Sequence, residues 1–249
     1  MTGRVDPFAH HPELRDRIAD PETSFFRTLT VEGLLRSNPE LGHLRGWVFS
    51  DTRREAIRRE ALRGHSGDLW VFAYGSLMWD PAIRFADVRR AHAPHHERQF
   101  ILRDTKGARG TQEAPGMMAA LDAGGGCDGL AFRISADNVD TETEILFRRE
   151  MIGPGYHAVF IEADIGAEAI CALTFLADHG SPDIHPDISR SDQVRHIATG
   201  KGFLGTSRQY LVNVVDHFRH LGIVDRHCAD LLVEVDAYIA AHGLRGDLP

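Results

Sequence analysis

The stretch LWVFAYGSLMWDP, residues 69–81, decides the fold. Its uninterrupted apolar run from Leu69 to Tyr74 ends at Gly75, and this pattern predicts a buried β-strand followed by a tight turn. Glycine at that point permits a close approach of the backbone and a positive φ. Successive N–H groups in such a turn can bind a carboxylate or an oxyanion. A strand followed by Gly and Ser is also a common structural turn, so the stretch alone leaves both interpretations open.

Outward from this stretch, short apolar runs alternate with turn residues and longer periodic segments. The glycines of 122–126 predict a hairpin that joins the strands 117–121 and 129–134. Strands with interposed helices, but without a regular βαβ repeat, indicate an α+β fold on a small, curled, mixed or antiparallel sheet. The other predicted strands are 98–102, 156–162 and 169–176, and the predicted helices are 138–152, 192–199, 207–221 and 228–242.

Residues 1–66 have a different character from the rest of the chain. They contain two charged stretches with helical periodicity, 13–19 and 52–63, separated by Pro, Gly and Asn. Residues 63–68 have the composition of a linker. We therefore expect a helical N-terminal extension over 1–66 and a second domain over 67–249.

The composition narrows the possible partners. The formal net charge of −8 argues against nucleic acid, because non-specific binding to nucleic acid depends on excess positive charge. No apolar run approaches the length of a membrane-spanning helix, and the N-terminus lacks the apolar core of a signal peptide. The three cysteines and fifteen histidines form no disulfide pattern or metal-binding motif. We expect a cytoplasmic protein that binds no metal, membrane or nucleic acid.

Two segments carry candidate functional groups. Arg109, Gly110 and Thr111 could bind an anionic group, since a guanidinium suits carboxylates, but a surface loop explains them equally well. On the predicted helix over 138–152, Glu150 lies above Leu146 and Phe147 and therefore on the apolar face. Arg148 and Arg149 are expected to point elsewhere.

A carboxylate on an apolar face has two interpretations. It is either a buried Glu satisfied by an arginine or a tyrosine, or a group whose pKa is raised by burial and that can accept a proton. Ser76 is a weak candidate for a nucleophile, because Gly75-Ser76 lacks the second half of a G-x-S-x-G turn.

Four segments together resemble one protein family. VFAYGSLMWDP, RGTQEAPG, RREMIGPGY and GFLGTSRQYL occur in the order and spacing of the ChaC family, over roughly residues 69–240. These proteins are glutathione-specific γ-glutamylcyclotransferases. The resemblance implies a small sheet closed into a barrel-like core with surrounding helices. It also implies a cofactor-free carbon–nitrogen lyase that acts on glutathione. The chain differs from the family at Ala73, where a glycine is usual.

The resemblance also implies roles for individual residues. The turn of Phe72, Ala73, Tyr74, Gly75, Ser76 and Leu77 would hold the γ-glutamyl group, and Glu150 would be the general acid and base. Arg109, Gly110 and Thr111 are further candidates for substrate binding, and Tyr74 and Tyr156 are candidate hydrogen-bond partners of Glu150 or the substrate. The alternatives are a cyclotransferase for other γ-glutamyl amino acids or amines, and a non-catalytic protein that senses a metabolite or regulates ion transport.

Overall fold

The predicted first strand forms as β1, Leu69–Ala73, and takes part in a closed barrel. Antiparallel pairing runs from β1 to β5, from β5 to β2, from β2 to β6 and from β6 to β7. β7 then pairs in parallel with β1, which closes the ring and leaves no free edge among these strands. The other barrel strands are β2 (Asp87–Ala93), β5 (Cys127–Ile134), β6 (Tyr156–Ile165) and β7 (Glu168–Ala177). This arrangement confirms the predicted α+β, barrel-like fold.

The computed structural model describes residues 6–244, which divide into two compact units. The first unit holds the chain up to Arg98 together with Leu121–Ala177, and therefore the whole barrel. The second unit holds Gln99–Ala120 and the chain from Asp178 onward. Strands β3 (His96–Asp104) and β4 (Gly116–Ala123) each begin in one unit and end in the other.

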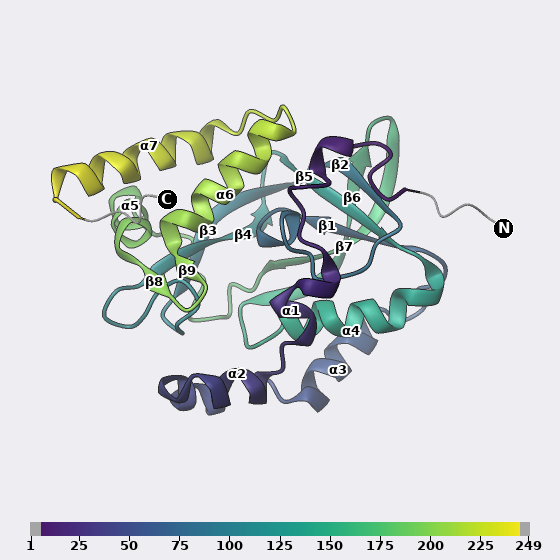
Figure 1. Ribbon diagram of the computed structural model, residues 1–249, viewed down its shortest axis with the longest axis horizontal. Helices are drawn as coiled ribbons and strands as arrows, with labels where there is room; N and C mark the ends of the chain where they lie inside the picture. The colour runs from purple at the N-terminus through teal and green to yellow at the C-terminus, as the bar shows by residue number, and fades with distance from the viewer. Residues whose placement is uncertain (1–5, 245–249) are drawn as a thin grey trace. The chain divides into compact units, whose positions relative to one another are not determined.

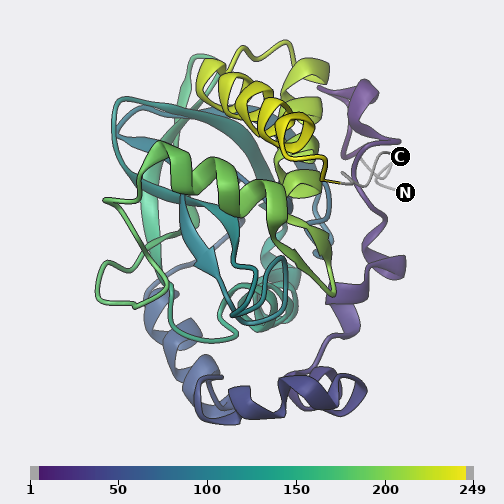
Figure 2. The ribbon, with the colours of Figure 1, turned by 90° about the vertical axis from the view of Figure 1, so that its left-hand side faces the viewer.

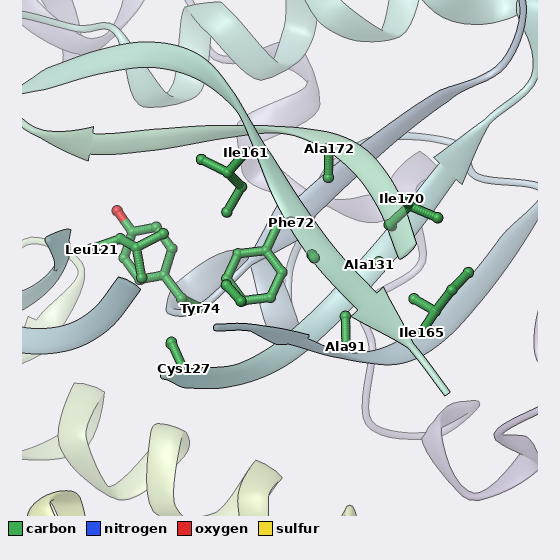
Figure 3. Close-up of a cluster of buried hydrophobic side chains, with 12 residues drawn as sticks. Phe72, Tyr74, Ala91, Leu121, Cys127, Ala131, Ile161, Ile165, Ile170 and Ala172 are labelled. Carbon is green, nitrogen blue, oxygen red and sulfur yellow. The ribbon is translucent and has the colours of Figure 1, made fainter. Parts of the chain in front are cut away.

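The interior of the barrel combines small and large side chains. A buried cluster receives residues from all five barrel strands, and five of its twelve residues are alanines. Barrel diameter grows with strand number, so a five-stranded barrel leaves limited space for the larger side chains. Figure 3 shows the rings of Phe72 and Tyr74 inside this cluster, between Ile161 and Cys127. The segment that leads into the glycine turn therefore contributes two aromatic side chains to the core of the first unit.

The predicted hairpin between 117–121 and 129–134 is wrong. β4 lies beside β3 and β7, whereas β5 lies between β1 and β2. The turn residues instead return to the start of β3, where the N–H groups of Gly124 and Gly126 donate to the carbonyls of His95 and His96. A turn signal shows that the chain changes direction but does not choose the partner strand.

The pairing of β5 with β1 brings their backbones close together. A Cβ atom at Gly129 of β5 would lie 2.2 Å from the carbonyl oxygen of Ala73, so only glycine fits there. The neighbouring strand β2 was not predicted from the sequence, because its buried Val88, Ala91 and Ala93 are separated by charged and polar residues and do not alternate regularly.

Residues N-terminal to the barrel pack against it within the same unit. α1 (Phe25–Thr28), α2 (Val31–Ser37) and α3 (Asp51–Ala61) begin at the capping residues Ser24, Thr30 and Ser50. Helix α3 confirms the prediction over 52–63. The helix predicted over 13–19 is wrong: a short 3₁₀ turn, Pro12–Leu14, occupies its start. Figure 2 shows the N-terminal segment leading to α2 and α3.

Helix α4 (Val139–Glu150) lies beside both α1 and α3 (Figure 1). From α3, the buried guanidinium of Arg58 donates to Thr143 and Asp140. From α1, Arg27 donates to both carboxylate oxygens of Glu142 at 2.8 and 3.0 Å. Glu142 is 0% exposed and also accepts the N–H of Arg84. The N-terminal segment is thus fastened to α4 by buried charged groups.

The second unit is mainly helical. α5 (Arg190–Thr199), α6 (Ser207–His220) and α7 (Arg226–Ala241) pack on one another and confirm the three predicted C-terminal helices. A two-stranded ladder, β8 (Lys201–Gly202) with β9 (Gly205–Thr206), precedes α6. Within residues 6–244, no helix combines the length and apolar character that crossing a membrane requires.

Breaking the buried pair should be costly. We expect Glu142→Ala to lower the free energy of unfolding by about 3–5 kcal/mol, because it leaves the Arg27 guanidinium buried without its anion. Urea denaturation measures this loss. Glu32→Ala is the matched control, since Glu32 pairs with Arg36 and Arg45 at the surface and its removal should cost less than about 1 kcal/mol. Equal losses in the two variants would contradict a supporting role for the buried pair.

Candidate active site

The end of α4 holds Glu150 in a fixed position. Leu146 and Phe147 are fully buried, and the Phe147 ring packs edge-on against Phe175 of β7 with the ring centroids 5.5 Å apart. The N–H of Met151 donates to the carbonyl of Phe147, which ends the helix at Glu150. From α3, the buried Arg54 guanidinium donates to the carbonyl of Met151 at 3.0 Å. Helix, barrel and N-terminal segment therefore all contribute to this position.

Glu150 is a nearly buried carboxylate beside a cation. Its side chain is 15% exposed, and its Oε1 lies 3.0 Å from Nη1 of Arg149. Burial raises the pKa of the Glu150 carboxyl above its ordinary value, and the charge of Arg149 opposes that rise. The predicted apolar setting of Glu150 is confirmed. It is also a Glu with an arginine partner, so features of both sequence interpretations occur together.

The prediction that Arg149 points away from Glu150 is wrong. Its side chain is 2% exposed, and its Nη2 donates to Oγ of Ser76 at 3.1 Å. Consecutive residues of an ideal helix face different directions, but the long flexible stem of arginine can curl around the end of the helix. Arg148 does point elsewhere, toward Glu144 and the carbonyl of Arg27.

The residues of the glycine turn divide into two groups. Phe72, Ala73 and Tyr74 are buried in the core, where the Tyr74 hydroxyl donates to the carbonyl of Phe175 at 2.9 Å. Gly75 and Ser76 follow the strand and lead into a 3₁₀ turn, Ser76–Met78. Gly75 has a φ of −136°, so the turn does not use the positive φ that glycine permits. Ser76 is the turn residue that contacts Arg149 and so adjoins Glu150.

A buried arginine forms hydrogen bonds with the backbone next to this turn. Arg98 donates from Nε to the carbonyl of Tyr74 at 2.5 Å and from Nη2 to the carbonyl of Asp128 at 2.6 Å. Beyond the carbonyl of Tyr74, the first N–H groups of the 3₁₀ turn, those of Ser76 and Leu77, have no intrahelical acceptor. They are donors that a bound anion could use.

Tyr156 and the loop before it also lie in the first unit. Tyr156 begins β6, is partly exposed, and stands opposite Ala177 in the sheet register. A Cβ atom at Gly153 would lie 2.8 Å from the Trp47 ring, so the N-terminal segment packs closely on the loop after Glu150. The N–H of Phe49 also donates to the carbonyl of Ile152 at 2.8 Å.

Arg109, Gly110 and Thr111 belong to the second unit, where they form a loop around Asp104. The carboxylate of Asp104 accepts the backbone N–H groups of Arg109 and Gly110. The Arg109 side chain is buried and donates to the carbonyl of Thr206, and the Thr111 hydroxyl accepts the N–H of Ala114. Much of the predicted anion-binding capacity of this loop is therefore used inside the unit.

The GFLGTSRQYL segment fastens the same loop. The N–H groups of Phe203 and Leu204 donate to the carbonyls of Gly107 and Ala108. The buried Ser207 hydroxyl donates to the carbonyl of Met117 and accepts its N–H. Two of the four sequence segments thus meet in the second unit, and the other two meet at Glu150 in the first.

Sequence reasoning missed the residues that hold the neighbours of Glu150 in place. Arg98, Arg54 and Phe26 are far from it in the chain, and no local pattern connects them. Phe26 lies over Arg149, with the guanidinium carbon 4.5 Å from the ring centroid. Arg149 carried one usable signal: a cation in the last turn of a helix is electrostatically favoured there. Among residues 6–244, no group of three or more His, Cys, Asp or Glu side chains is arranged to hold a metal ion.

Comparison with known proteins identifies similar chains. A family model described as ChaC-like protein matches residues 69–238. A glutathione-specific γ-glutamylcyclotransferase of Escherichia coli (strain K12) is 35% identical over 181 residues, which are 72% of this chain and 78% of that one. A protein of the same name from Schizosaccharomyces pombe is 30% identical over 68% of this chain and 93% of its own length.

A solved structure supports the fold independently. The crystal structure of a selenomethionine-labelled γ-glutamyl cyclotransferase specific to glutathione from yeast superposes with a TM-score of 0.64. The alignment covers 70% of this chain and 97% of the yeast chain, at 17% sequence identity. At that identity the likeness establishes the shared fold.

The raised pKa of Glu150 has a consequence for stability that can be measured without a substrate. Below the unfolded-state pKa of about 4.3, the folded and unfolded chains are both protonated at this residue. As the pH rises through the folded-state pKa, the extra stability that the bound proton gives the folded chain is lost. We therefore expect the free energy of unfolding of the wild type to fall relative to Glu150→Gln as the pH rises from about 4.3 toward neutrality. Urea denaturation across this range tests the sign, and a relative gain by the wild type would contradict it.

Proposed function

This chain belongs to the ChaC-like protein family, and from that membership we propose that it is a glutathione-specific γ-glutamylcyclotransferase. It would convert glutathione to 5-oxoproline and Cys-Gly. The observation that carries the proposal is Glu150, a nearly buried carboxylate with a raised pKa that adjoins the glycine turn through Arg149. The substrate preference is drawn from relatives such as the Escherichia coli protein.

The proposed reaction is an intramolecular attack. The α-amine of the glutamyl group attacks its own γ-carbonyl carbon, a five-membered lactam closes, and the bond to the cysteinyl nitrogen breaks. The α-ammonium, with a reference pKa of about 8, is not nucleophilic until it loses a proton. The cysteinyl nitrogen must gain a proton to leave. One group that first accepts and then donates a proton satisfies both requirements, and no water is consumed.

Glu150 suits this double role because two opposing influences act on its pKa. Burial raises the pKa and brings it closer to that of the ammonium, which eases proton transfer. The adjacent charge of Arg149 limits the rise, which favours the ionised form that can accept a proton. The same carboxyl, once protonated, can return its proton to the leaving amine.

The glycine turn is proposed to bind the γ-glutamyl group mainly through its backbone. The side chains of Phe72 and Tyr74 lie in the core, so these residues and Ala73 would act by shaping the turn. The N–H groups of Ser76 and Leu77, with Gly75 beside them, would donate hydrogen bonds to the substrate α-carboxylate or the developing oxyanion.

Four residues remain as further proposed contacts. Tyr156 follows the loop that leaves Glu150 and carries a hydroxyl suited to hydrogen bonding. Arg109, Gly110 and Thr111 stay proposed substrate-binding residues on the strength of the family resemblance. For Arg109 the buried guanidinium would be the group that binds, since the backbone N–H groups of Arg109 and Gly110 are taken by Asp104.

We place this activity in the cytoplasm. Cys127, Cys171 and Cys228 are all free thiols, and Cys171 is exposed. Free thiols persist in reducing compartments, where glutathione keeps them reduced.

The activity is tested by incubating purified protein with glutathione and detecting 5-oxoproline and Cys-Gly by mass spectrometry. We expect turnover by the wild type and a loss of about 10²–10⁴-fold in Glu150→Gln, since the general base is removed. Glu144→Gln is the matched control on the same helix: Glu144 is exposed, pairs with Arg148, and should tolerate the change.

Two further measurements separate the rival functions. Turnover of γ-glutamyl-alanine at a rate equal to that of glutathione would replace glutathione specificity with a broader cyclotransferase activity. Glutathione binding by calorimetry in the absence of any 5-oxoproline would instead indicate a protein that senses the metabolite. The loss of a general base lowers turnover by at least about 10²-fold. Retention of more than a few per cent of wild-type turnover in Glu150→Gln would therefore remove Glu150 from the mechanism.

A further inference from the structure

The N-terminal segment, which lies outside the family-matched residues, contributes an aromatic ring beside the candidate base. Phe26 of α1 covers the guanidinium of Arg149 at 4.5 Å from ring centroid to guanidinium carbon. Phe26 also packs against the apolar cluster of residues 29–44, which Ile152 contacts as well. The ring therefore fills the space between the N-terminal cluster and the end of α4.

Helix α1 is tied down on both sides of Phe26. The hydroxyl of Ser24 donates to the Asp80 carboxylate at 2.7 Å. Arg27 donates to Glu142 and to the carbonyl of Ala82, and its own carbonyl accepts Nη2 of Arg148 at 2.7 Å. A four-residue helix has little stability of its own, so these bonds are what hold Phe26 in place.

The guanidinium beneath Phe26 is incompletely bonded. Arg149 is buried, and among the residues that the structure describes neither its Nε nor its Nη1 has a hydrogen-bond partner. The Nη1–Glu150 contact has the distance of an ion pair without the alignment of a hydrogen bond. Buried donors without acceptors gain free energy by reaching water. The ring of Phe26 covers the guanidinium and attracts the cation through its face.

We propose that Phe26 is a positioning residue for the reaction: it holds the Arg149 guanidinium against Glu150 and Ser76 and so sets the electrostatic environment of the base. This inference rests on the proposed role of Glu150. It gives the N-terminal extension a function, because the extension completes the surroundings of the catalytic carboxylate instead of merely preceding the catalytic domain.

The other charged groups packed on this helix have partners of their own. Arg27 and Arg84 bond to Glu142, and Arg148 bonds to Glu144. From α3, Arg54 bonds to Asp51 and to the carbonyl of Met151. Arg149 is the charged side chain at ion-pair distance from Glu150, and it is the one that lowers the pKa of that carboxyl.

The loss of Phe26 should therefore act on Glu150 through Arg149. Without the ring, the guanidinium can turn toward water and the ion pair weakens. Burial of Glu150 is then less opposed, so the pKa of Glu150 rises further. At a given pH a larger fraction of Glu150 is then protonated and cannot accept a proton from the substrate. The acidic limb of the pH–rate profile therefore moves to higher pH, and kcat/KM falls at each pH on that limb.

The pKa of Glu150 can be read directly from the carboxyl ¹³C signal of protein labelled in its glutamates. The signal is identified by its absence in Glu150→Gln. We expect Phe26→Ala and Arg149→Met both to raise the pKa of Glu150, and Phe26→Tyr, which keeps the aromatic face, to restore it. Phe8→Ala is the matched control, because Phe8 also lies under an arginine, Arg15, in the N-terminal segment but belongs to a separate contact with Phe85.

The outcomes are separable from those of the activity test. If the wild type makes no 5-oxoproline, the proposed function fails, whereas the titration still reports whether Phe26 acts on Glu150. An unchanged or lowered pKa of Glu150 in Phe26→Ala would overturn the inference, and so would an unchanged pKa in Arg149→Met. If Phe26→Ala does not fold, as judged by circular dichroism, Phe26→Leu replaces it, with a rise in the pKa expected because the cation–π contact is lost while apolar volume is kept.

Discussion

A carboxylate kept away from water at the end of a helix is the constraint on which the rest of the structure depends. Placing Glu150 on the apolar side of α4 costs free energy whenever it is ionised, because burial favours the neutral form. The structure offsets part of this cost with the charge of Arg149. The result is an acid whose pKa lies above its ordinary value while its partner opposes a larger rise.

That balance requires a rigid setting, and several parts of the first unit supply it. The barrel gives α4 a fixed surface through Phe175, and Arg98 holds the carbonyl of the turn that precedes Ser76. The N-terminal segment holds α4 from the other side through Arg27, Arg54 and Arg58. These buried arginines can hold the elements together because each forms hydrogen bonds to a carboxylate, a hydroxyl or a backbone carbonyl.

Prediction from the sequence succeeded where a pattern is local and failed where a partner had to be chosen. The strand before Gly75, the helix that ends at Glu150 and the three C-terminal helices follow from periodicity and turn residues. The hairpin over 117–134 failed because a glycine-rich turn does not specify which strand lies alongside. The direction of Arg149 failed because helical spacing describes where a side chain starts, and not where a long stem ends.

The sequence by itself determined the apolar run of β1, the apolar face of α4 with Glu150 on it, and the four segments that indicate the family. Each of these is a property of neighbouring residues, and hydrophobic periodicity records it directly. Only the tertiary structure decided that Arg149 faces Glu150 and that Phe26 covers Arg149. The physical reason is that burial, ion pairing and ring contacts arise between groups brought together by packing, and the pKa of a carboxylate depends on those surroundings and not on its position in the chain.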